Sequence, residues 1–322
     1  MRALICGVSG QDGAYLSQFL HQRGYEVHGT SRDAEAGSFD NLRRVGIREH
    51  VIKHSMDSNE FRSVLQVLTR TVPDEIYSLA GQSSVGLSFE QPVETLESNS
   101  IGTLNLLEAM RILGKPIKLY SAGSGECFGD THGEAANEAT TFHPRSPYAI
   151  AKATAHWLVS NYREAYGLHA STGILFNHES PLRSRRFVTR KIVATACAIA
   201  AGSRERLTLG NLGIHRDWGW APEYVEAMWL MLQQPHGGDF VIATGQQHSL
   251  AEFADEAFSH LGLNWRDHTD SSPALYRPTD ILCSRGNADK AAAVLGWRPN
   301  WTMRQVVRGM VDAERNGAAT PS

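Results

Sequence analysis

Near its start the chain reads Ala3-Leu4-Ile5-Cys6 and then Gly7-Val8-Ser9-Gly10-Gln11-Asp12-Gly13, a short apolar run followed by a glycine-rich turn. The apolar run predicts a buried strand, and the residues after the turn have the period of a helix. A strand, a GxxGxxG turn and a helix are typical of a dinucleotide-binding unit, because the turn brings backbone N–H groups close to a pyrophosphate. We therefore expect Gly7, Gly10, Gln11, Asp12 and Gly13 to bind a cofactor. The alternative is a glycine-rich turn without a ligand.

Short apolar runs alternate with helical segments through the first half of the chain. The expected strands are Ala3–Cys6, Glu26–Thr30, Val51–Ser55, Glu75–Leu79, Ile117–Ala122 and Ser171–Phe176. The expected helices are Ala14–Gln22, Asn59–Thr69, Ser98–Leu113 and Pro147–Tyr166. This alternation predicts an α/β fold with a doubly wound, Rossmann-type parallel sheet.

The regular alternation of strands and helices ends after Asn177. Arginine-rich loops follow, and then a helix near Arg190–Ala201, a strand at Phe240–Ala243 and two late helices. We place a Rossmann domain in residues 1–178, with a return segment at about 213–246. Residues 179–322 form mainly a smaller, ligand-binding lobe, and we expect the tail Gly317–Ser322 to be disordered.

Composition excludes several classes of partner. The formal charge of −3 offers no field for nucleic acid or an anionic membrane. The four cysteines are far apart and follow no disulfide or metal-ligand spacing, so we expect free thiols, a reducing compartment and no metal site. The first apolar run is too short for a signal peptide or a membrane span, which makes the cytoplasm the expected location.

The end of the second strand indicates which nicotinamide cofactor is bound. A carboxylate at this point accepts a hydrogen bond from the ribose of NAD and repels the extra phosphate of NADP. The chain instead reads Gly29-Thr30-Ser31-Arg32, and the guanidinium favours a phosphate. We therefore expect NADP, with Arg32 at its phosphate. Asp33 follows directly and has the alternative role of capping a turn.

A catalytic set is expected near the fifth strand. Tyr148 and Lys152 are four residues apart on a predicted helix, so they share a face, and the ammonium is expected to lower the phenol pKa from about 10. Ser124 and Glu126 lie in the loop after that strand, at the sheet edge where such folds bind ligands. Ser124 is suited to a sugar hydroxyl and Glu126 to proton transfer at carbon. An ordinary turn serine and a solvated loop acid are the alternatives.

Beyond these sites the chain resembles the GDP-mannose 4,6-dehydratases of the extended short-chain dehydrogenase superfamily over nearly its whole length. The resemblance rests on the segments Gly7–Leu16, Pro144–Lys152, Gly173–Pro181, Phe187–Lys191, Arg216–Gly219, Asp239–Gly245 and Arg277-Pro278. The segments Asn177-His178-Glu179-Ser180-Pro181 and Arg216-Asp217-Trp218-Gly219 are much more specific than the glycine turn.

The resemblance implies roles for individual residues. Ser124, Glu126, Tyr148 and Lys152 match the catalytic set, in which Tyr148 and Lys152 also contact the cofactor. Further cofactor contacts match Met56, Leu79, Gln82, Ser83, His178 and Arg183, and substrate contacts match Asn177, Lys191, Asn211, Arg216 and Arg277. The chain departs from the family pattern at Ser78, at Gly125 and in the loop Asp33–Asp40. The altered loop puts in doubt how the adenosine phosphate and a tetramer contact are held.

The implied reaction is an internal redox cycle on a nucleotide sugar: oxidation at C4, loss of water across C5 and C6, and return of hydride to C6. A GDP-manno-heptose fits the same description. A sugar epimerase or reductase on this scaffold needs Tyr148 and Lys152 but has no required use for Glu126. A non-catalytic NADP sensor is expected to lack Tyr148 or Lys152, and both are present.

Related dehydratases also imply a homodimer or homotetramer, paired through the helices Ser98–Leu113 and Pro147–Tyr166. The candidate contact residues are Leu104, Leu107, Trp157 and Val159, each of which has the alternative of facing its own sheet.

Overall fold

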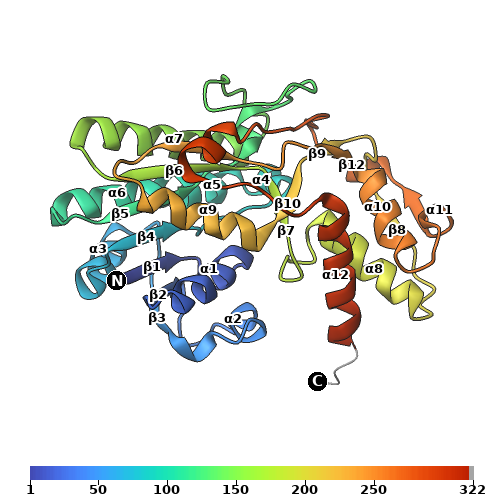
Figure 1. Ribbon diagram of the computed structural model, residues 1–322, viewed down its shortest axis with the longest axis horizontal. Helices are drawn as coiled ribbons and strands as arrows, with labels where there is room; N and C mark the ends of the chain where they lie inside the picture. The colour runs from blue at the N-terminus through green and yellow to red at the C-terminus, as the bar shows by residue number, and fades with distance from the viewer. Residues whose placement is uncertain (319–322) are drawn as a thin grey trace.

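A seven-stranded parallel sheet forms the centre of the computed structural model, which describes residues 1–318 (Figure 1). Its strands are β1 (Arg2–Cys6), β2 (Glu26–Ser31), β3 (Val51–Ser55), β4 (Glu75–Ser78), β5 (Lys118–Ala122), β6 (Ala170–Leu175) and β11 (Asp239–Ile242). The order across the sheet is β3-β2-β1-β4-β5-β6-β11, and every neighbouring pair is parallel. The expected doubly wound Rossmann-type fold is confirmed. The order reverses between β1 and β4, which is where such sheets open a crevice for ligands.

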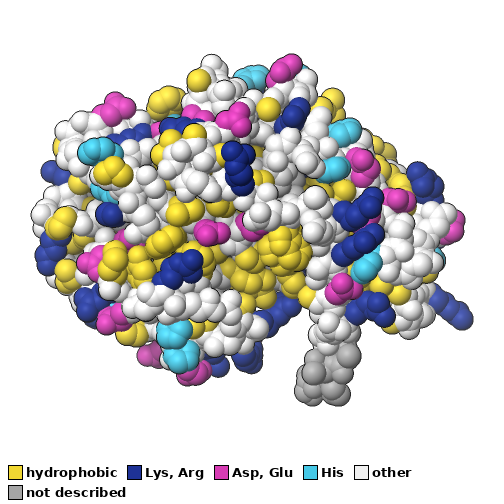
Figure 2. All heavy atoms as spheres, viewed as in Figure 1, with side chains coloured by type: hydrophobic (Ala, Val, Ile, Leu, Met, Phe, Trp, Pro, Cys, Tyr) yellow, Lys and Arg dark blue, Asp and Glu magenta, His cyan; other side chains and the backbone are white. Residues whose placement is uncertain are grey.

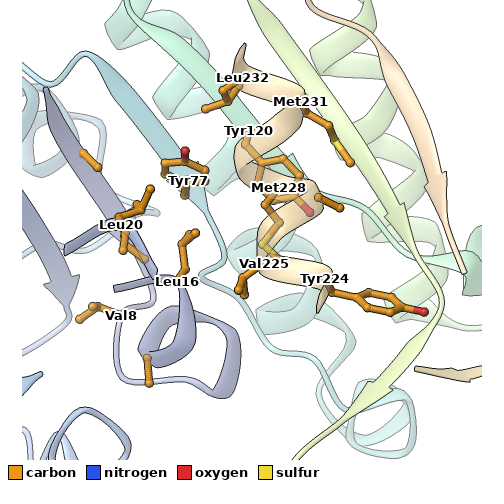
Figure 3. Close-up of a cluster of buried hydrophobic side chains, with 14 of the residues drawn as sticks. Val8, Leu16, Leu20, Tyr77, Tyr120, Tyr224, Val225, Met228, Met231 and Leu232 are labelled. Atoms are coloured by element: carbon orange, nitrogen blue, oxygen red, sulfur yellow. The ribbon is translucent and has the colours of Figure 1, made fainter. Parts of the chain in front are cut away.

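Helices cover both faces of this sheet. One face carries α1 (Gln11–Gln22), α2 (Asp40–Arg44) and α9 (Ala221–Gln233), and the other carries α3 (Phe61–Thr71), α6 (Gly102–Leu113) and α7 (Pro147–Tyr166). On the first face, Leu16 and Leu20 of α1 meet Val225 and Met228 of α9 above the sheet (Figure 3). The segment containing α9 and β11 thus returns from late in the sequence to complete the core of the Rossmann unit.

The longest helix, α7, has its ends fixed by local chemistry. Ser146 caps its start by accepting a hydrogen bond from the backbone N–H of Ala149, and Pro147 occupies the first turn, where no N–H is needed. Gly167 follows the last residue with a φ of 66°, a left-handed conformation that ends helices. These signals place Tyr148 in the first turn of α7, at the carboxyl edge of the sheet.

The smaller lobe is built from short elements beside the sheet (Figure 1). Its helices are α8 (Val188–Ala200), α10 (Leu250–Ser259), α11 (Trp265–His268) and α12 (Met303–Ala318). Three strand pairs accompany them: β7 (Asn177–Glu179) with β10 (Trp218–Trp220), β8 (Leu207–Leu209) with β13 (Thr269–Ser271), and β9 (His215–Arg216) with β12 (His248–Ser249). The helices α8, α10 and α12 enclose a second hydrophobic core. Short connectors complete the chain: α4 (Val85–Glu90), α5 (Pro92–Leu96), η1 (Arg48–His50), η2 (Glu97–Ile101), η3 (Gly125–Phe128), η4 (Pro273–Leu275) and η5 (Ala291–Leu295).

Some predicted boundaries are wrong for local reasons. The first helix begins at Gln11 rather than Ala14, because the last residues of the glycine turn are already helical. The helix predicted from Ser98 is preceded by a π-helical turn over Glu97–Ile101, and regular α-helix starts at Gly102. Gly317 and Ala318 belong to α12, so disorder is wrong for them, and residues 319–322 of the predicted tail lie outside the described residues.

The surface agrees with the balanced composition. Positive and negative side chains are interspersed over the face seen in Figure 2, without a large region of one sign. All four cysteines are free thiols, as their spacing predicts. Among residues 1–318, no helix is both long and apolar enough to cross a membrane. The cytoplasmic location stays a prediction.

Replacing Arg163 by alanine is expected to destabilise the Rossmann unit by about 2 kcal/mol, because a charged group with several hydrogen bonds is lost. Arg163 of α7 donates to both carboxylate oxygens of Asp239 at 3.1 and 2.6 Å and to the carbonyl of Ala170. Urea unfolding measures the change. The control is Arg206→Ala, which breaks an exposed pair with Asp270 and is expected to cost about 0.5 kcal/mol or less. Equal losses in the two variants would contradict the role of Arg163.

Candidate active site

A single cleft of about 1150 Å³ runs along the carboxyl edge of the sheet and continues into the smaller lobe. Its walls come from the turn after β1, the ends of β2 and β4, the loop after β5, the start of α7 and the β7 region. Sequence analysis predicted many of the residues that line it: Gly7, Gly10, Gln11, Asp12, Gly13, Arg32, Met56, Leu79, Gln82, Ser83, Ser124, Glu126, Tyr148, Lys152, Asn177, His178, Arg183, Arg216 and Arg277. The fold therefore brings together residues from most of the chain.

The glycine turn has no room for side chains. A Cβ on Gly13 would lie 2.5 Å from the carbonyl oxygen of Gly7, and a Cβ on Gly7 would lie 2.8 Å from the backbone nitrogen of Ala80. Gly7 also has a φ of 83°, which favours glycine. Helix α1 starts directly after the turn, and no side chain caps its N–H groups. This narrow turn with free helical N–H groups fits the pyrophosphate of a dinucleotide.

The end of β2 differs from that of an NAD-binding strand. Arg32 is exposed and lines the cleft. The neighbouring carboxylate of Asp33 accepts hydrogen bonds from the backbone N–H groups of Glu35 and Ala36 at 2.9 and 2.8 Å. Asp33 therefore caps a turn, the alternative that the sequence left open, through one oxygen of its carboxylate. The guanidinium of Arg32 is the cation that the end of β2 presents to the cleft.

The residues predicted to be catalytic meet at the loop after β5. The backbone N–H of Glu126 donates to the hydroxyl of Ser124, and the ammonium of Lys152 donates to the carbonyl of Ala122 at 2.8 Å. Tyr148 enters from α7 and is 9% exposed. Burial strongly raises the pKa of Tyr148, while a hydrogen bond with Ser124 opposes that rise. Burial lowers the pKa of Lys152 to about 8.

One electrostatic expectation is wrong for this structure. The sequence predicted that the ammonium of Lys152 lowers the phenol pKa of Tyr148, yet that pKa is raised. The reason is geometric: Lys152 donates to a backbone carbonyl and lies 5.9 Å from the centre of the Tyr148 ring, whereas burial acts on the phenol directly. Tyr148 therefore requires further positive charge nearby before it can act as a base.

Arg216 connects the loop after β5 to the smaller lobe. It is 4% exposed, and its Nη1 donates to the carbonyls of His215 and Ile281. Its Nε lies 3.9 Å from a carboxylate oxygen of Glu126. Within the part of the chain that the structure describes, its Nη2 is buried without a hydrogen-bond partner. A buried N–H group with no partner beside a cleft is a site for an anionic ligand.

Two predicted substrate residues do not line the cleft. The ammonium of Lys191 donates to the carbonyl of Thr208 at 2.7 Å, and the side-chain oxygen of Asn211 accepts from the backbone of Gly213. The side chain of Lys191 on α8 is engaged by β8 and that of Asn211 by its own loop, and their assignment as substrate contacts has no support from this geometry. It stays a prediction.

The cleft also contains residues that sequence analysis missed. They include Ser9, Asn41, Ser58, Asn59, Arg186, Trp218 and Ser284. Ser9 and Trp218 had a usable signal, because they belong to the segments Gly7–Leu16 and Arg216–Gly219. The others belong to no motif, and only the fold brings them to the cleft.

Comparisons with known proteins agree with one another. The sequence model of the family described as GDP-mannose 4,6 dehydratase matches residues 4–310. GDP-mannose 4,6 dehydratase 1 of Arabidopsis thaliana is 46% identical over 97% of this chain and 89% of the plant protein. The GDP-mannose 4,6-dehydratase of Sinorhizobium fredii is 44% identical over 96% of this chain and 95% of the bacterial protein.

Solved structures show the same architecture. The UDP-glucose 4-epimerase of Thermus thermophilus in complex with NAD superposes with a TM-score of 0.87 at 28% identity, covering 98% of this chain and 99% of the epimerase. The dTDP-glucose 4,6-dehydratase of Bacillus anthracis superposes with a TM-score of 0.86 at 19% identity, covering 99% of this chain and 98% of that one. The second likeness shows the fold alone.

Replacing Arg216 by lysine and Arg277 by alanine is expected to weaken GDP binding, by roughly 1.5–3 kcal/mol for each charged hydrogen bond lost. Lysine at 216 keeps a positive charge opposite Glu126 but loses the directed N–H groups of the guanidinium. Calorimetric titration with GDP and, separately, with NADP measures both sites, and Arg304→Lys on an exposed ion pair is the control. Loss of NADP binding with unchanged GDP binding would assign these arginines to the other ligand.

Proposed function

Because this chain belongs to the GDP-mannose 4,6-dehydratase family, we propose that it removes water from GDP-mannose and releases the 4-keto-6-deoxy sugar nucleotide. A nicotinamide cofactor takes part, as the glycine turn and the NAD-bound Thermus thermophilus relative support. The domain division at residues 178 and 179 is part of this proposal. It assigns the cofactor mainly to the Rossmann unit and the nucleotide sugar mainly to the smaller lobe.

One observation carries the proposal: a carboxylate lies in the same cleft as the tyrosine and lysine pair. Glu126 is 12% exposed in its side chain and has the cation of Arg216 beside it. A reductase or an epimerase moves a hydride and a hydroxyl proton, and Tyr148 is sufficient for that proton. Loss of water across a carbon–carbon bond also requires a base for a carbon-bound hydrogen, and Glu126 fills that role.

The residues divide the proton transfers between them. Tyr148 takes the proton of the sugar 4-hydroxyl, and the resulting ketone acidifies the hydrogen on C5. Glu126 removes that hydrogen and returns a proton to the departing 6-hydroxyl, so that water leaves. Ser124 hydrogen-bonds the sugar at the reacting hydroxyl. When bound, the oxidised nicotinamide supplies a hydride acceptor and a positive charge, and in its reduced form it supplies the hydride that C6 receives.

We assign NADP rather than NAD to the cofactor site. Arg32 is the charged group that the end of β2 presents to the cleft, and the adjacent acid is engaged in its own turn. A guanidinium binds a phosphate through charge-assisted hydrogen bonds, while the ribose of NAD finds no carboxylate there.

We also propose that the protein is at least a dimer, paired through α7 and the helical segment before α6. Trp157 and Ile150 on α7 and Ile101 at the end of η2 are 62%, 47% and 43% exposed. Large apolar side chains gathered on neighbouring elements favour burial against a second subunit. Of the residues proposed from sequence, Trp157 is free for this contact, whereas Leu107 and Val159 are fully buried against their own sheet and Leu104 packs against the same core.

Replacing Arg32 by glutamate is expected to shift the cofactor preference from NADP toward NAD, because the new carboxylate repels the phosphate and accepts from the ribose hydroxyl. Titration of the purified variant with each cofactor measures the ratio of the two dissociation constants. Arg23→Glu, at the residue that follows α1 and does not line the cleft, is the control for the change of charge. An unchanged ratio would mean that the phosphate is recognised elsewhere.

Replacing Trp157 by glutamate is expected to separate the subunits, because burying a charge in an apolar contact is unfavourable. Light scattering at micromolar concentration measures the mass. The control is Val294→Glu on η5, where valine is 51% exposed outside the proposed contact. A monomeric wild-type protein would exclude the dimer.

The last prediction separates dehydration from simple oxidation. In Glu126→Gln the amide keeps the side-chain size but cannot accept the C5 hydrogen, so the cycle is expected to stop after the first hydride transfer. Reduced-cofactor absorbance then rises on mixing with GDP-mannose to about one equivalent per site, and deuterium exchange at C5 is suppressed. Tyr148→Phe is expected to abolish both signals. Glu134→Gln in a nearby exposed loop is the control.

Normal turnover by Glu126→Gln would remove the main chemical support for dehydration. Parallel assays with GDP-mannose and a GDP-manno-heptose, followed by mass spectrometry for loss of water, identify the preferred sugar. Absence of the dehydrated product with either sugar in the wild-type protein would contradict the proposed reaction.

A further inference from the structure

The ring of His178 lies between two hydrogen-bond acceptors. Its Nδ1 is 2.8 Å from the carbonyl oxygen of Phe176, and its Nε2 is 2.9 Å from a carboxylate oxygen of Asp12. A neutral imidazole has one N–H and one lone pair, so it can satisfy only one acceptor. Two acceptors at hydrogen-bond distance require both nitrogens to carry hydrogen, which makes the ring a cation.

We propose that Asp12 and His178 form an ion pair, and that His178 is a positioning residue which holds the glycine turn for the cofactor. Asp12 lies in the first turn of α1, where the backbone N–H groups favour binding of an anion. A lone carboxylate there would repel a pyrophosphate. The positive ring of His178 cancels that charge and ties the turn to β7, which is 166 residues away in the sequence.

Neighbouring contacts hold this pair in one geometry. The amide of Gln11 donates to the second carboxylate oxygen of Asp12 at 3.0 Å and to the carbonyl of His178 at 3.2 Å. The hydroxyl of Ser180 donates to the oxygen of the same Gln11 amide. The ring of Tyr224 stacks on His178 with a centroid distance of 4.5 Å. The pair therefore connects α1, β7 and α9, the three elements that meet beside the pyrophosphate turn.

The electrostatics of the pair follow its geometry. Burial alone lowers the pKa of His178, but the charge of Asp12 and the two hydrogen bonds outweigh burial and leave the pKa raised. Burial alone raises the pKa of Asp12, and His178 reverses this so that it is lowered. Other titratable groups that face or influence the pair are Arg183, Lys152, Tyr15, Tyr120 and Tyr224.

The direction of the pH effect follows from these shifts. A histidine whose pKa is raised on folding contributes stability that is fully present below its ordinary value of 6.5 and is lost as the pH rises through the raised value. Above that value a lone pair on the ring faces an acceptor oxygen, so one of the ring's two hydrogen bonds is lost and the link between the turn and β7 is weakened. Cofactor affinity is then expected to fall in the same window.

The charge of His178 is tested without any cofactor, by ring-¹⁵N histidine NMR at about pH 6, below the ordinary histidine pKa of 6.5 from which the pKa of His178 is raised. His178→Gln identifies the signal by its loss, and Asp12→Asn identifies it by its shift if the first variant does not fold. In the wild-type protein both ring nitrogens are expected to be protonated. In Asp12→Asn the new amide can donate to the ring, so one nitrogen is expected to lose its hydrogen. A neutral ring in the wild-type protein would overturn the proposal.

The positioning role rests on the proposed cofactor and is tested by NADP titration. Asp12→Asn is expected to bind NADP about tenfold more weakly near neutral pH, and without the pH dependence of the wild-type protein. The control is Asp312→Asn, which breaks an exposed pair with His260 outside the cleft and is expected to leave the affinity unchanged. Equal or tighter binding by Asp12→Asn would overturn the positioning role. Failure of the wild-type protein to bind NADP would instead count against the proposed function and leave the NMR result standing.

Discussion

The fold depends on the close approach of the backbone to itself in the turn after β1. The space between Gly13 and the carbonyl of Gly7 does not admit a Cβ, and the same is true between Gly7 and the chain after β4. This contact directs the start of α1 toward the cleft and lays the rest of α1 on the sheet, where α9 packs against it. A larger residue at Gly13 would move α1, and with it both the ligand site and a large part of the core.

Charge places a second constraint on the cleft. The protein has a net charge of −3, yet both proposed ligands carry phosphates. Attraction must therefore be local, and the structure supplies it through single cations with defined neighbours. Arg216 is held by two carbonyls and faces Glu126, which keeps one N–H of the guanidinium available for a ligand. The arginine that we propose for the diphosphate thus lies 3.9 Å from the acid that we propose for proton transfer.

Sequence alone predicted features that depend on neighbours along the chain. The strands of the sheet, the glycine turn and the helix Pro147–Tyr166 follow from local periodicity and end signals. Features that depend on contacts between residues far apart in the sequence could not be predicted from local sequence patterns. Lys191 lies in a segment that matches the family, but its ammonium donates to the carbonyl of Thr208 in β8, which only the fold brings near. Lys152 stands at the right spacing from Tyr148, and the burial that controls the phenol pKa comes from the surrounding elements.

The pair of Asp12 and His178 shows why such information cannot be read from a motif. Both residues are visible in the sequence as separate cofactor contacts, and neither segment indicates that histidine is charged. The charge state follows only when the carbonyl of Phe176 and the carboxylate of Asp12 are placed on opposite sides of one ring. Asp12 then does not repel a phosphate at the turn, because its partner is the cation of His178 on β7, the strand that leads into the smaller lobe. The cofactor turn and the substrate lobe are therefore coupled by charge as well as by packing.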